Sequence, residues 1–298
     1  MREPARADHA RGGRRGDAHR VAHRLRARSR LRERAGPRRG ATPGVGLAFA
    51  CLGSSGAVPS ATRDTTALLV RAGGTSCLID VGGSPVQKLR RLGVDPVTLG
   101  GVVVTHTHPD HVYGLPALVQ CLLILGRRAP LPVYCRTEHV AVVRGLLELF
   151  GLLAEGLDVP VVGVEAREGA PVLETADLVV TTSPNVHGSM PNLAVRVDAG
   201  GRRLVYSSDT RPCPEVVALA RGADVLVHEA TFSRQDPAEW HSTARDAGEV
   251  ARRAGARRLV LAHVGYREHT LLAARTREAR AAFGGPVVVA KELRWYAV

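Results

Sequence analysis

The sequence predicts an α/β fold in which two β-sheets pack face to face and helices cover their outer surfaces. From residue 46 onward, short apolar strands alternate with stretches of helical composition. Helical stretches occur in both halves of the chain, between groups of strands that are typical of hairpins. At 298 residues, the chain is also long enough to bury a large core. Together these observations favour two packed sheets over one parallel sheet.

The individual elements follow from apolar runs bounded by Gly, Pro and polar residues. Strands are expected at residues 46–52, 66–71, 76–80, 101–105, 131–135, 159–164, 178–182, 193–197, 203–207, 225–228 and 259–262. Helices are expected at residues 85–92, 113–125, 138–153, 244–254 and 269–282. The strands at 66–71 and 76–80 should pair around the Ala-Gly-Gly-Thr turn between them. The apolar stretch at 145–153 is expected to be buried in the core, and a homodimer surface is the alternative.

The basic charge of the chain lies mainly at its N-terminus. Residues 1–44 hold 14 arginines against four acidic residues, which leaves 27 basic and 24 acidic residues, a net of +3, over residues 45–298. Because this segment lacks sustained hydrophobic periodicity, we expect a disordered Arg-rich tail ahead of a domain at 45–298. Three interpretations remain open: a solvated appendage or mis-annotated start, an arm that attracts RNA or DNA, and an organellar transit peptide.

The five cysteines point to a reducing compartment. Their number is odd and no two have the C-x-x-C spacing of a zinc knuckle or redox motif. We therefore expect small buried apolar side chains rather than disulfides. No apolar run approaches the roughly 20 residues of a membrane span, and no secretory signal is recognisable. A soluble cytoplasmic protein without membrane contact is expected.

The strongest chemical signal is the segment THTHPDH, directly after the predicted strand at 101–105. It places His106, His108, Asp110 and His111 at the carboxyl end of a strand, just before a helix. A tight turn can direct the first two side chains to one metal ion and the other two to a second. Imidazole nitrogen and carboxylate oxygen are the ligands of zinc sites that keep a position open for water.

Further ligands are expected downstream, because this segment supplies only part of two coordination shells. His187, Asp209 and His263 each follow a predicted strand, at 178–182, 203–207 and 259–262. A rigid strand can direct a side chain at its end. The sequence therefore predicts seven metal ligands in all.

These residues resemble the metallo-β-lactamase superfamily, through the H-x-H-x-D-H block followed by a later His, Asp and His. The resemblance covers residue 46 to the C-terminus and implies a four-layer αββα fold with two mixed sheets packed face to face. Further segments are similar to the ribonuclease Z branch: LGSSGAVPS at 52–60, GLP at 114–116, DTRP at 209–212, HEATF at 228–232 and HSTA at 241–244.

The resemblance implies two zinc ions, one held by His106, His108 and His187 and the other by Asp110, His111 and His263. Asp209 would bridge the two ions together with a hydroxide that attacks phosphorus, and manganese is the alternative metal. His241 would protonate the leaving oxygen, oriented and kept cationic by Glu229. Asp110 is a secondary candidate for proton relay.

Other polar residues near these motifs have less specific roles. His228 is expected to be structural or to support a ligand without contacting the metal, because it alternates with Glu229 along its strand. His139 and His269 carry no motif and are expected on the surface. The turn at 53–56 either presents backbone N–H groups to a phosphate or is purely structural.

The chain departs from the ribonuclease Z pattern in one respect. Members that process transfer RNA carry a long arm between the residues equivalent to His187 and Asp209, whereas residues 188–208 already account for a hairpin here. A small cyclic or nucleotide phosphodiester therefore suits the site better than a tRNA precursor, and RNA remains an alternative substrate. The other hypotheses are a hydrolase of a sulfate ester, lactone or thioester, and a non-catalytic nucleic-acid-binding protein.

Overall fold

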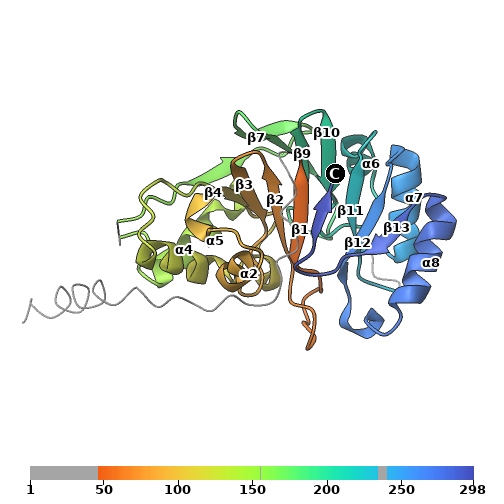
Figure 1. Ribbon diagram of the computed structural model, residues 1–298, viewed down its shortest axis with the longest axis horizontal. Helices are drawn as coiled ribbons and strands as arrows, with labels where there is room; N and C mark the ends of the chain where they lie inside the picture. The colour runs from red at the N-terminus through yellow and green to blue at the C-terminus, as the bar shows by residue number, and fades with distance from the viewer. Residues whose placement is uncertain (1–45, 155, 234–239) are drawn as a thin grey trace, which may run out of the picture. The chain divides into compact units, whose positions relative to one another are not determined.

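The computed structural model describes residues 46–154, 156–233 and 240–298, so the predicted tail at 1–44 lies outside the described residues. The described chain forms two seven-stranded mixed sheets (Figure 1). The first sheet has the order β14 (Trp295–Ala297), β1 (Ala48–Gly53), β2 (Ala67–Ala72), β3 (Thr75–Ile79), β4 (Leu99–Val103), β5 (Val133–Arg136) and β6 (Val161–Val164). The second has the order β13 (Val287–Val289), β12 (Leu259–Val264), β11 (Val225–Ala230), β10 (Arg202–Tyr206), β9 (Leu193–Ala199), β8 (Val179–Pro184) and β7 (Ala170–Glu174).

The two sheets repeat one pairing pattern. In the first sheet, the pairs from β14 to β3 are antiparallel and those from β3 to β6 are parallel. In the second, the pairs from β7 to β10 are antiparallel and those from β10 to β13 are parallel. The carboxyl ends of parallel strands meet at one edge of a sheet, which is where open α/β folds place their ligands.

Helices cover the outer face of each sheet. Figure 1 shows one group on one side of the paired sheets: α2 (Pro85–Arg91), α4 (Leu115–Ile124) and α5 (Val140–Leu149). The opposite side carries α6 (Pro214–Leu219), α7 (Ala244–Ala254) and α8 (Leu272–Phe283). The short elements are α3 (Pro109–Val112) and the 3₁₀ turns η1 (Pro96–Thr98), η2 (Thr137–His139) and η3 (Tyr266–Glu268).

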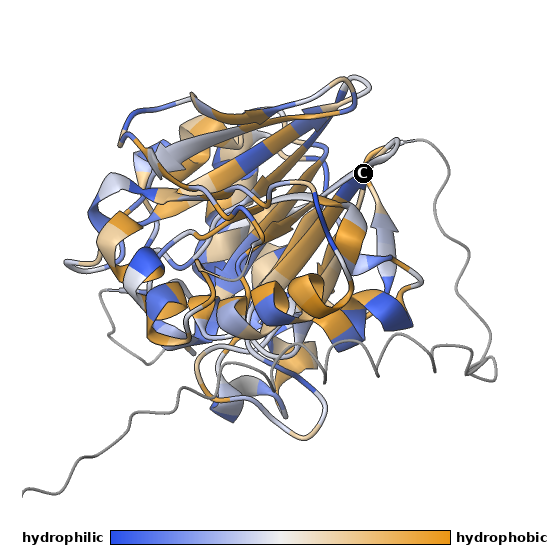
Figure 2. Cartoon of the chain, turned by 90° about the vertical axis from the view of Figure 1, so that its left-hand side faces the viewer, coloured by the Kyte–Doolittle hydropathy of each residue, from blue (hydrophilic) through white to orange (hydrophobic). Residues whose placement is uncertain are grey.

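Three large apolar clusters fill the interfaces between these four layers. Along β2, Leu68 and Val70 face the cluster between the sheets, and Leu69 faces the cluster under the helices of the first sheet. A third cluster joins the second sheet to α6, α7 and α8. Because alternate side chains of a central strand are buried on both faces, the strands are apolar along most of their length (Figure 2). The predicted αββα architecture is confirmed.

Most predicted elements are present, with three kinds of difference. Helix α7 has the predicted bounds, whereas α5 ends at Leu149 instead of continuing to residue 153. The helix expected at 113–125 is present as α4 (Leu115–Ile124), and the separate short helix α3 (Pro109–Val112) precedes it. Strands β7, β13 and β14 and helix α6 were not predicted, because each is short and is defined by its neighbours in space.

The described residues agree with two compositional expectations. No helix among them is long and apolar enough to cross a membrane. All five cysteines are free, and four of them are buried.

Candidate metal centre

Strand ends position every predicted ligand. The chain is extended from the end of β4 through His106 to His108, and Pro109 then begins α3, which carries Asp110 and His111. His187 follows β8, Asp209 follows β10, and His263 is the penultimate residue of β12. The ligands of the first sheet therefore come from one segment, and those of the second sheet come from three.

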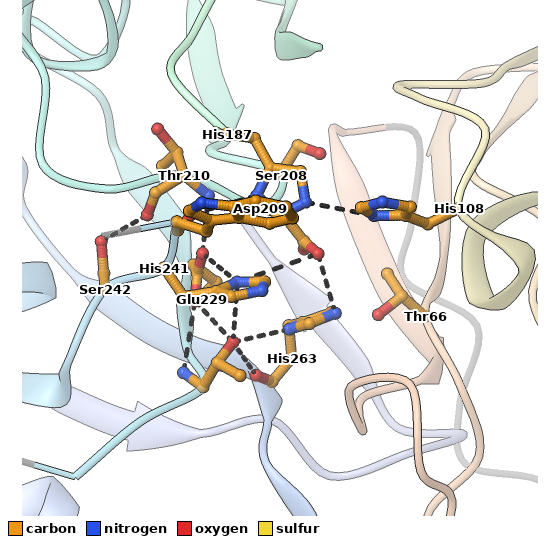
Figure 3. A network of polar contacts seen from close by, with 12 residues as sticks. Thr66, His108, His187, Ser208, Asp209, Thr210, Glu229, His241, Ser242 and His263 are labelled. Atoms are coloured by element: carbon orange, nitrogen blue, oxygen red, sulfur yellow. Dashed lines mark hydrogen bonds and ion pairs between the residues drawn. The ribbon is translucent and has the colours of Figure 1, made fainter. Parts of the chain in front are cut away.

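The first group of ligand atoms is compact. The distance from His106 Nε2 to His108 Nδ1 is 3.0 Å, and that from His187 Nε2 to the same Nδ1 is 3.1 Å. Figure 3 shows His108 reaching toward His187 from the opposite side of the site. His106, His108 and His187 together satisfy the geometry of a metal-binding group.

The second group lies beside it. Asp110 Oδ2 is 3.5 Å from His111 Nε2 and 3.4 Å from His263 Nε2. Asp209 Oδ2 is 3.1 Å from His263 Nε2, 3.3 Å from His111 Nε2 and 3.9 Å from His106 Nε2. Its carboxylate thus lies between the two groups.

These spacings fit metal ions. Tetrahedral zinc with bonds of about 2.0–2.1 Å separates its ligand atoms by about 3.3 Å, close to the distances within both groups. Moreover, His111 Nε2, His263 Nε2 and Asp209 Oδ1 are buried without a hydrogen-bond partner. Buried polar atoms normally have a hydrogen-bond partner, so three unpartnered atoms in one cluster fit a site that can hold a metal ion.

The opposite ring nitrogen of each buried histidine is held by the protein. His111 Nδ1 lies 2.8 Å from Asp80 Oδ2, and His263 Nδ1 lies 2.8 Å from Thr231 Oγ1. His187 Nδ1 donates to the carbonyl oxygen of Trp240 at 3.0 Å. Such contacts fix the tautomer that presents Nε2 to the metal. Sequence reasoning missed Asp80, whose only local signal is a carboxylate that ends an apolar strand.

The backbone is strained at this site. Within the described residues, four residues other than glycine have positive φ, and three of them are Asp80 (60°), Ser208 (53°) and His263 (45°). Positive φ is costly for residues with a side chain, and it persists where the surrounding structure enforces it. His263 is a predicted ligand, Ser208 directly precedes the ligand Asp209, and Asp80 contacts the ligand His111.

Burial and charge set the protonation states. Burial lowers the pKa of His106 well below its ordinary value and also lowers the pKa of His108 and His187. Burial alone would raise the pKa of Asp209, but His263 and His111 hold it well below its usual range. The three rings are therefore neutral and the carboxylate is ionised near neutral pH, which are the forms that bind metals.

Glu229 and His241 form an ion pair beside the ligands. Glu229 is fully buried, and its Oε1 accepts from His241 Nδ1 at 2.9 Å and from the backbone N–H of Thr210 at 2.6 Å. Its Oε2 accepts from the hydroxyl of Thr231, which also contacts His263 (Figure 3). Burial would lower the pKa of His241, but the Glu229 carboxylate outweighs it and raises that pKa to about 9.

A pocket of about 550 Å³ opens over these residues. Its floor includes His108, Asp110, Asp209, His241 and His263, and its walls include Val58, Phe232, Trp240 and Tyr266. The structure thus brings all nine predicted metal and catalytic residues together, since His106, His111 and His187 lie against this floor and Glu229 supports His241.

Three secondary predictions have different outcomes. His139 is not a surface residue: it is buried, with Nε2 donating to Pro191 O at 2.7 Å and Nδ1 contacting Thr107 Oγ1, so it joins loops from the two sheets. His269 is half-buried and contacts Ser55 Oγ. His228 is fully buried away from the ligand groups, as expected for a structural residue.

The turn at 53–56 is structural. The backbone N–H groups of Ser54, Ser55 and Gly56 donate to acceptors inside the protein, so they do not form a phosphate cradle. A Cβ at Gly56 would lie 3.1 Å from His263 Cε1. The glycine therefore lets the turn pack closely against a ligand ring.

Comparison with known proteins identifies the family. A family model described as a beta-lactamase superfamily domain matches residues 75–264. Ribonuclease Z of Myxococcus xanthus is 34% identical over 288 residues, covering 80% of this chain and 94% of that protein. Ribonuclease Z of Methanothermobacter thermautotrophicus is 31% identical over 268 residues, covering 72% of this chain and 86% of that protein.

The fold has a solved counterpart. The metallo-β-lactamase fold protein YhfI from Bacillus subtilis superimposes with a TM-score of 0.73 at 23% identity, covering 85% of this chain and 99% of that one. With the His and Asp clusters at the strand ends, these similarities lead to one conclusion. The chain belongs to the metallo-β-lactamase superfamily and is related to ribonuclease Z.

Proposed function

We propose that the protein is a binuclear zinc phosphodiesterase of the ribonuclease Z type. The observation that carries this proposal is the buried Glu229–His241 pair, which lies directly beside the ligand cluster. Esters with good leaving groups need no general acid, whereas a phosphodiester with an alkoxide leaving group gains most from one. The pair therefore favours a phosphodiester over a thioester, whose thiolate leaves without protonation. The similarity to ribonuclease Z favours a phosphodiester over a lactone or sulfate ester.

The residues would divide between the two ions as the family resemblance implies. His106, His108 and His187 would hold one, Asp110, His111 and His263 the other, and Asp209 lies where it would bridge them. When bound, zinc or manganese ions supply Lewis-acid chemistry: they acidify water and neutralise phosphoryl charge. The protein's task is to hold the donor atoms in place and, by burial, to keep the rings of His106, His108 and His187 neutral.

His241 is the proposed general acid. Its Nδ1 is occupied by Glu229, so Nε2 carries the proton available for the leaving oxygen. The raised pKa of about 9 keeps the ring cationic at neutral pH. Glu229 cannot reorient, because its two oxygens also accept from Thr210 and Thr231. Asp110 lines the same pocket and is a secondary proton relay.

A small cyclic or nucleotide diester is the proposed substrate, with RNA as the larger alternative, and the cytoplasm is the proposed location. An RNA-grasping arm would be inserted in the sequence between His187 and Asp209. In this chain the β9–β10 hairpin, residues 193–206, takes up most of that interval. The alignment with the Myxococcus relative is 288 positions long but includes only 80% of the 298 residues of this chain. Some segments of that relative therefore have no counterpart here.

Hydrolysis of bis(p-nitrophenyl) phosphate by the zinc-loaded protein tests the proposal. We expect turnover that is lost in Asp209→Ala and retained in Asp177→Ala, since Asp177 lies in the β7–β8 turn and contacts Gly74 and Thr75 at the β2–β3 turn. Absence of turnover with metal bound would refute phosphodiesterase activity and favour another ester.

Deletion of the predicted tail distinguishes the enzyme hypothesis from the hypothesis of a nucleic-acid-binding protein. We propose that residues 45–298 form the hydrolase domain, so deletion of residues 1–44 should leave turnover of the small diester intact. If the protein were instead a binding module that uses its arginines, the deletion would abolish RNA binding and no turnover would be seen before or after it.

A homodimer is proposed through the helices of the first sheet. The ends of α4 and α5 expose Ile124, Leu149 and Phe150, with 79%, 77% and 62% of their surface accessible. Apolar side chains that are this exposed, at the ends of two helices in contact with each other, favour an interface. Light scattering should give twice the chain mass for the wild type and the monomer mass for Leu149→Glu, and a monomeric wild type would refute the dimer.

A further inference from the structure

The pocket over the metal centre has aromatic walls. The whole chain contains only four Phe, two Trp and five Tyr, yet Phe232, Trp240 and Tyr266 all line this one pocket. About half the surface of Trp240 and of Tyr266 is exposed, 49% and 51% respectively. Exposed rings that gather around a polar floor are typical of binding sites rather than of packing.

Trp240 is held in place with part of its indole open. A Cβ on Gly188, which has a φ of +56°, would lie 2.6 Å from Trp240 Cε2, so the glycine backbone packs directly against the indole. The ring also meets His187 edge-on, with centroids 5.9 Å apart. The exposed half of the indole therefore lies on the side away from Gly188 and faces the pocket.

Tyr266 is fixed by its neighbour. The guanidinium of Arg267 lies 5.5 Å from the centroid of the phenol ring, and Arg267 Nε donates to the Tyr266 hydroxyl at 2.8 Å. A cation over an aromatic ring is attracted to its π face. The ring follows β12 by two residues, so it stands close to the ligand His263.

We propose that Trp240 and Tyr266 form a stacking site for a nucleobase, so that the preferred diester carries a nucleoside; this inference rests on the proposed function. Every base has a π face, and stacking on aromatic side chains binds it without sequence preference. Leu or Ile side chains would bind an aliphatic ester group equally well, and the pocket lining contains neither residue. The volume of about 550 Å³ also exceeds the needs of a bare phosphate.

Calorimetry on the zinc-loaded full chain tests the stacking site. The probes are adenosine 5′-monophosphate and ribose 5-phosphate, which share phosphate and sugar and differ in the base. We expect the nucleotide to bind at least about tenfold more tightly, the gain expected of one stacked base. Trp240→Ala and Tyr266→Ala should each reduce this ratio. Trp240→Phe, which keeps a ring, should preserve it, as should Val288→Ala on the exposed edge strand β13.

The outcomes separate the subsite from the hydrolytic reaction. Because both probes carry the same phosphate, a change in metal binding affects both affinities and cancels in their ratio. Equal affinities in the wild type, or a ratio unchanged in both alanine variants, would overturn the stacking site even if bis(p-nitrophenyl) phosphate is hydrolysed. A preserved base preference without any turnover would support the stacking site and refute the phosphodiesterase.

Discussion

At the scale of residues, the site depends on the contacts that orient each ligand ring through the nitrogen that does not face the metal. Asp80 is the clearest case, because its carboxylate is fully buried and accepts from His111 Nδ1, Thr105 N and Thr105 Oγ1. Ser208 Oγ in turn donates to Thr105 Oγ1, which links the first sheet to the loop that carries Asp209. A ligand's position is therefore decided by residues that never contact the metal.

Replacing Asp80 by Asn should weaken metal binding by about 10- to 100-fold. If the amide oxygen keeps the hydrogen bond from Thr105 N, the NH₂ group faces His111 Nδ1, which then has to accept a hydrogen bond instead of donating one. The imidazole proton moves to Nε2, and that nitrogen can no longer bind zinc. Competition against a chromogenic chelator measures the affinity.

Asp177→Asn is the matched control for that experiment, because the same chemical change occurs in a partly exposed carboxylate at a turn. Its metal affinity should equal that of the wild type. An Asp80→Asn protein with unchanged affinity would show that His111 does not need its partner.

Replacing His241 by Asn should affect substrates according to their leaving groups. For a dinucleoside phosphate, which expels an alkoxide, we expect kcat/KM to fall by roughly 10²–10⁴-fold. For bis(p-nitrophenyl) phosphate the loss should be much smaller, because p-nitrophenolate leaves without protonation. Each substrate serves as the control for the other, and equal losses would exclude a general-acid role.

The sequence predicted the residues that lie in local motifs and missed those defined by distant contacts. His106, His108, Asp110 and His111 fall within six positions. In contrast, Asp80 lies 31 positions from His111. The chain pattern around Asp80 contains nothing that distinguishes it from an ordinary residue at a strand end. The partnership exists only because β3 and β4 are neighbours in the sheet.

At the scale of elements, local signals determined how accurately the bounds were predicted. Helix α7 has the predicted bounds because a capping box of Thr243 and Asp246 begins it and Gly255, with left-handed backbone, ends it. Strands β13 and β14 have three residues each and lie at sheet edges. Such short runs acquire strand structure from their partner, so no periodicity within them could predict it.

Replacing Thr243 by Ala should destabilise the fold by about 1 kcal/mol. The Thr243 hydroxyl accepts from Asp246 N, and its loss leaves a backbone donor of α7 without its cap. Urea denaturation followed by circular dichroism measures the free energy of unfolding. Thr62→Ala, in the exposed loop after β1, is the control and should leave stability unchanged. A loss no larger than in this control would contradict the role of the cap.

At the scale of the whole molecule, the site exists because two similar halves meet. Each sheet has antiparallel strands on one side and parallel strands on the other, and each contributes ligands from strand ends. The first half supplies its four ligands in one segment, and the second supplies three from β8, β10 and β12. The sequence predicted this architecture because both halves have the same alternation of strands and helices. The aromatic walls could not be predicted, because Phe232, Trp240 and Tyr266 converge only in the folded chain.

Zinc titration of the metal-stripped protein tests the central claim most directly. Bound metal is measured by elemental analysis, and turnover of bis(p-nitrophenyl) phosphate is followed in the same samples. The two ligand groups predict that binding saturates at two zinc ions per chain and that turnover rises until both are bound. Saturation at a single ion, or full turnover with one ion bound, would contradict a binuclear centre.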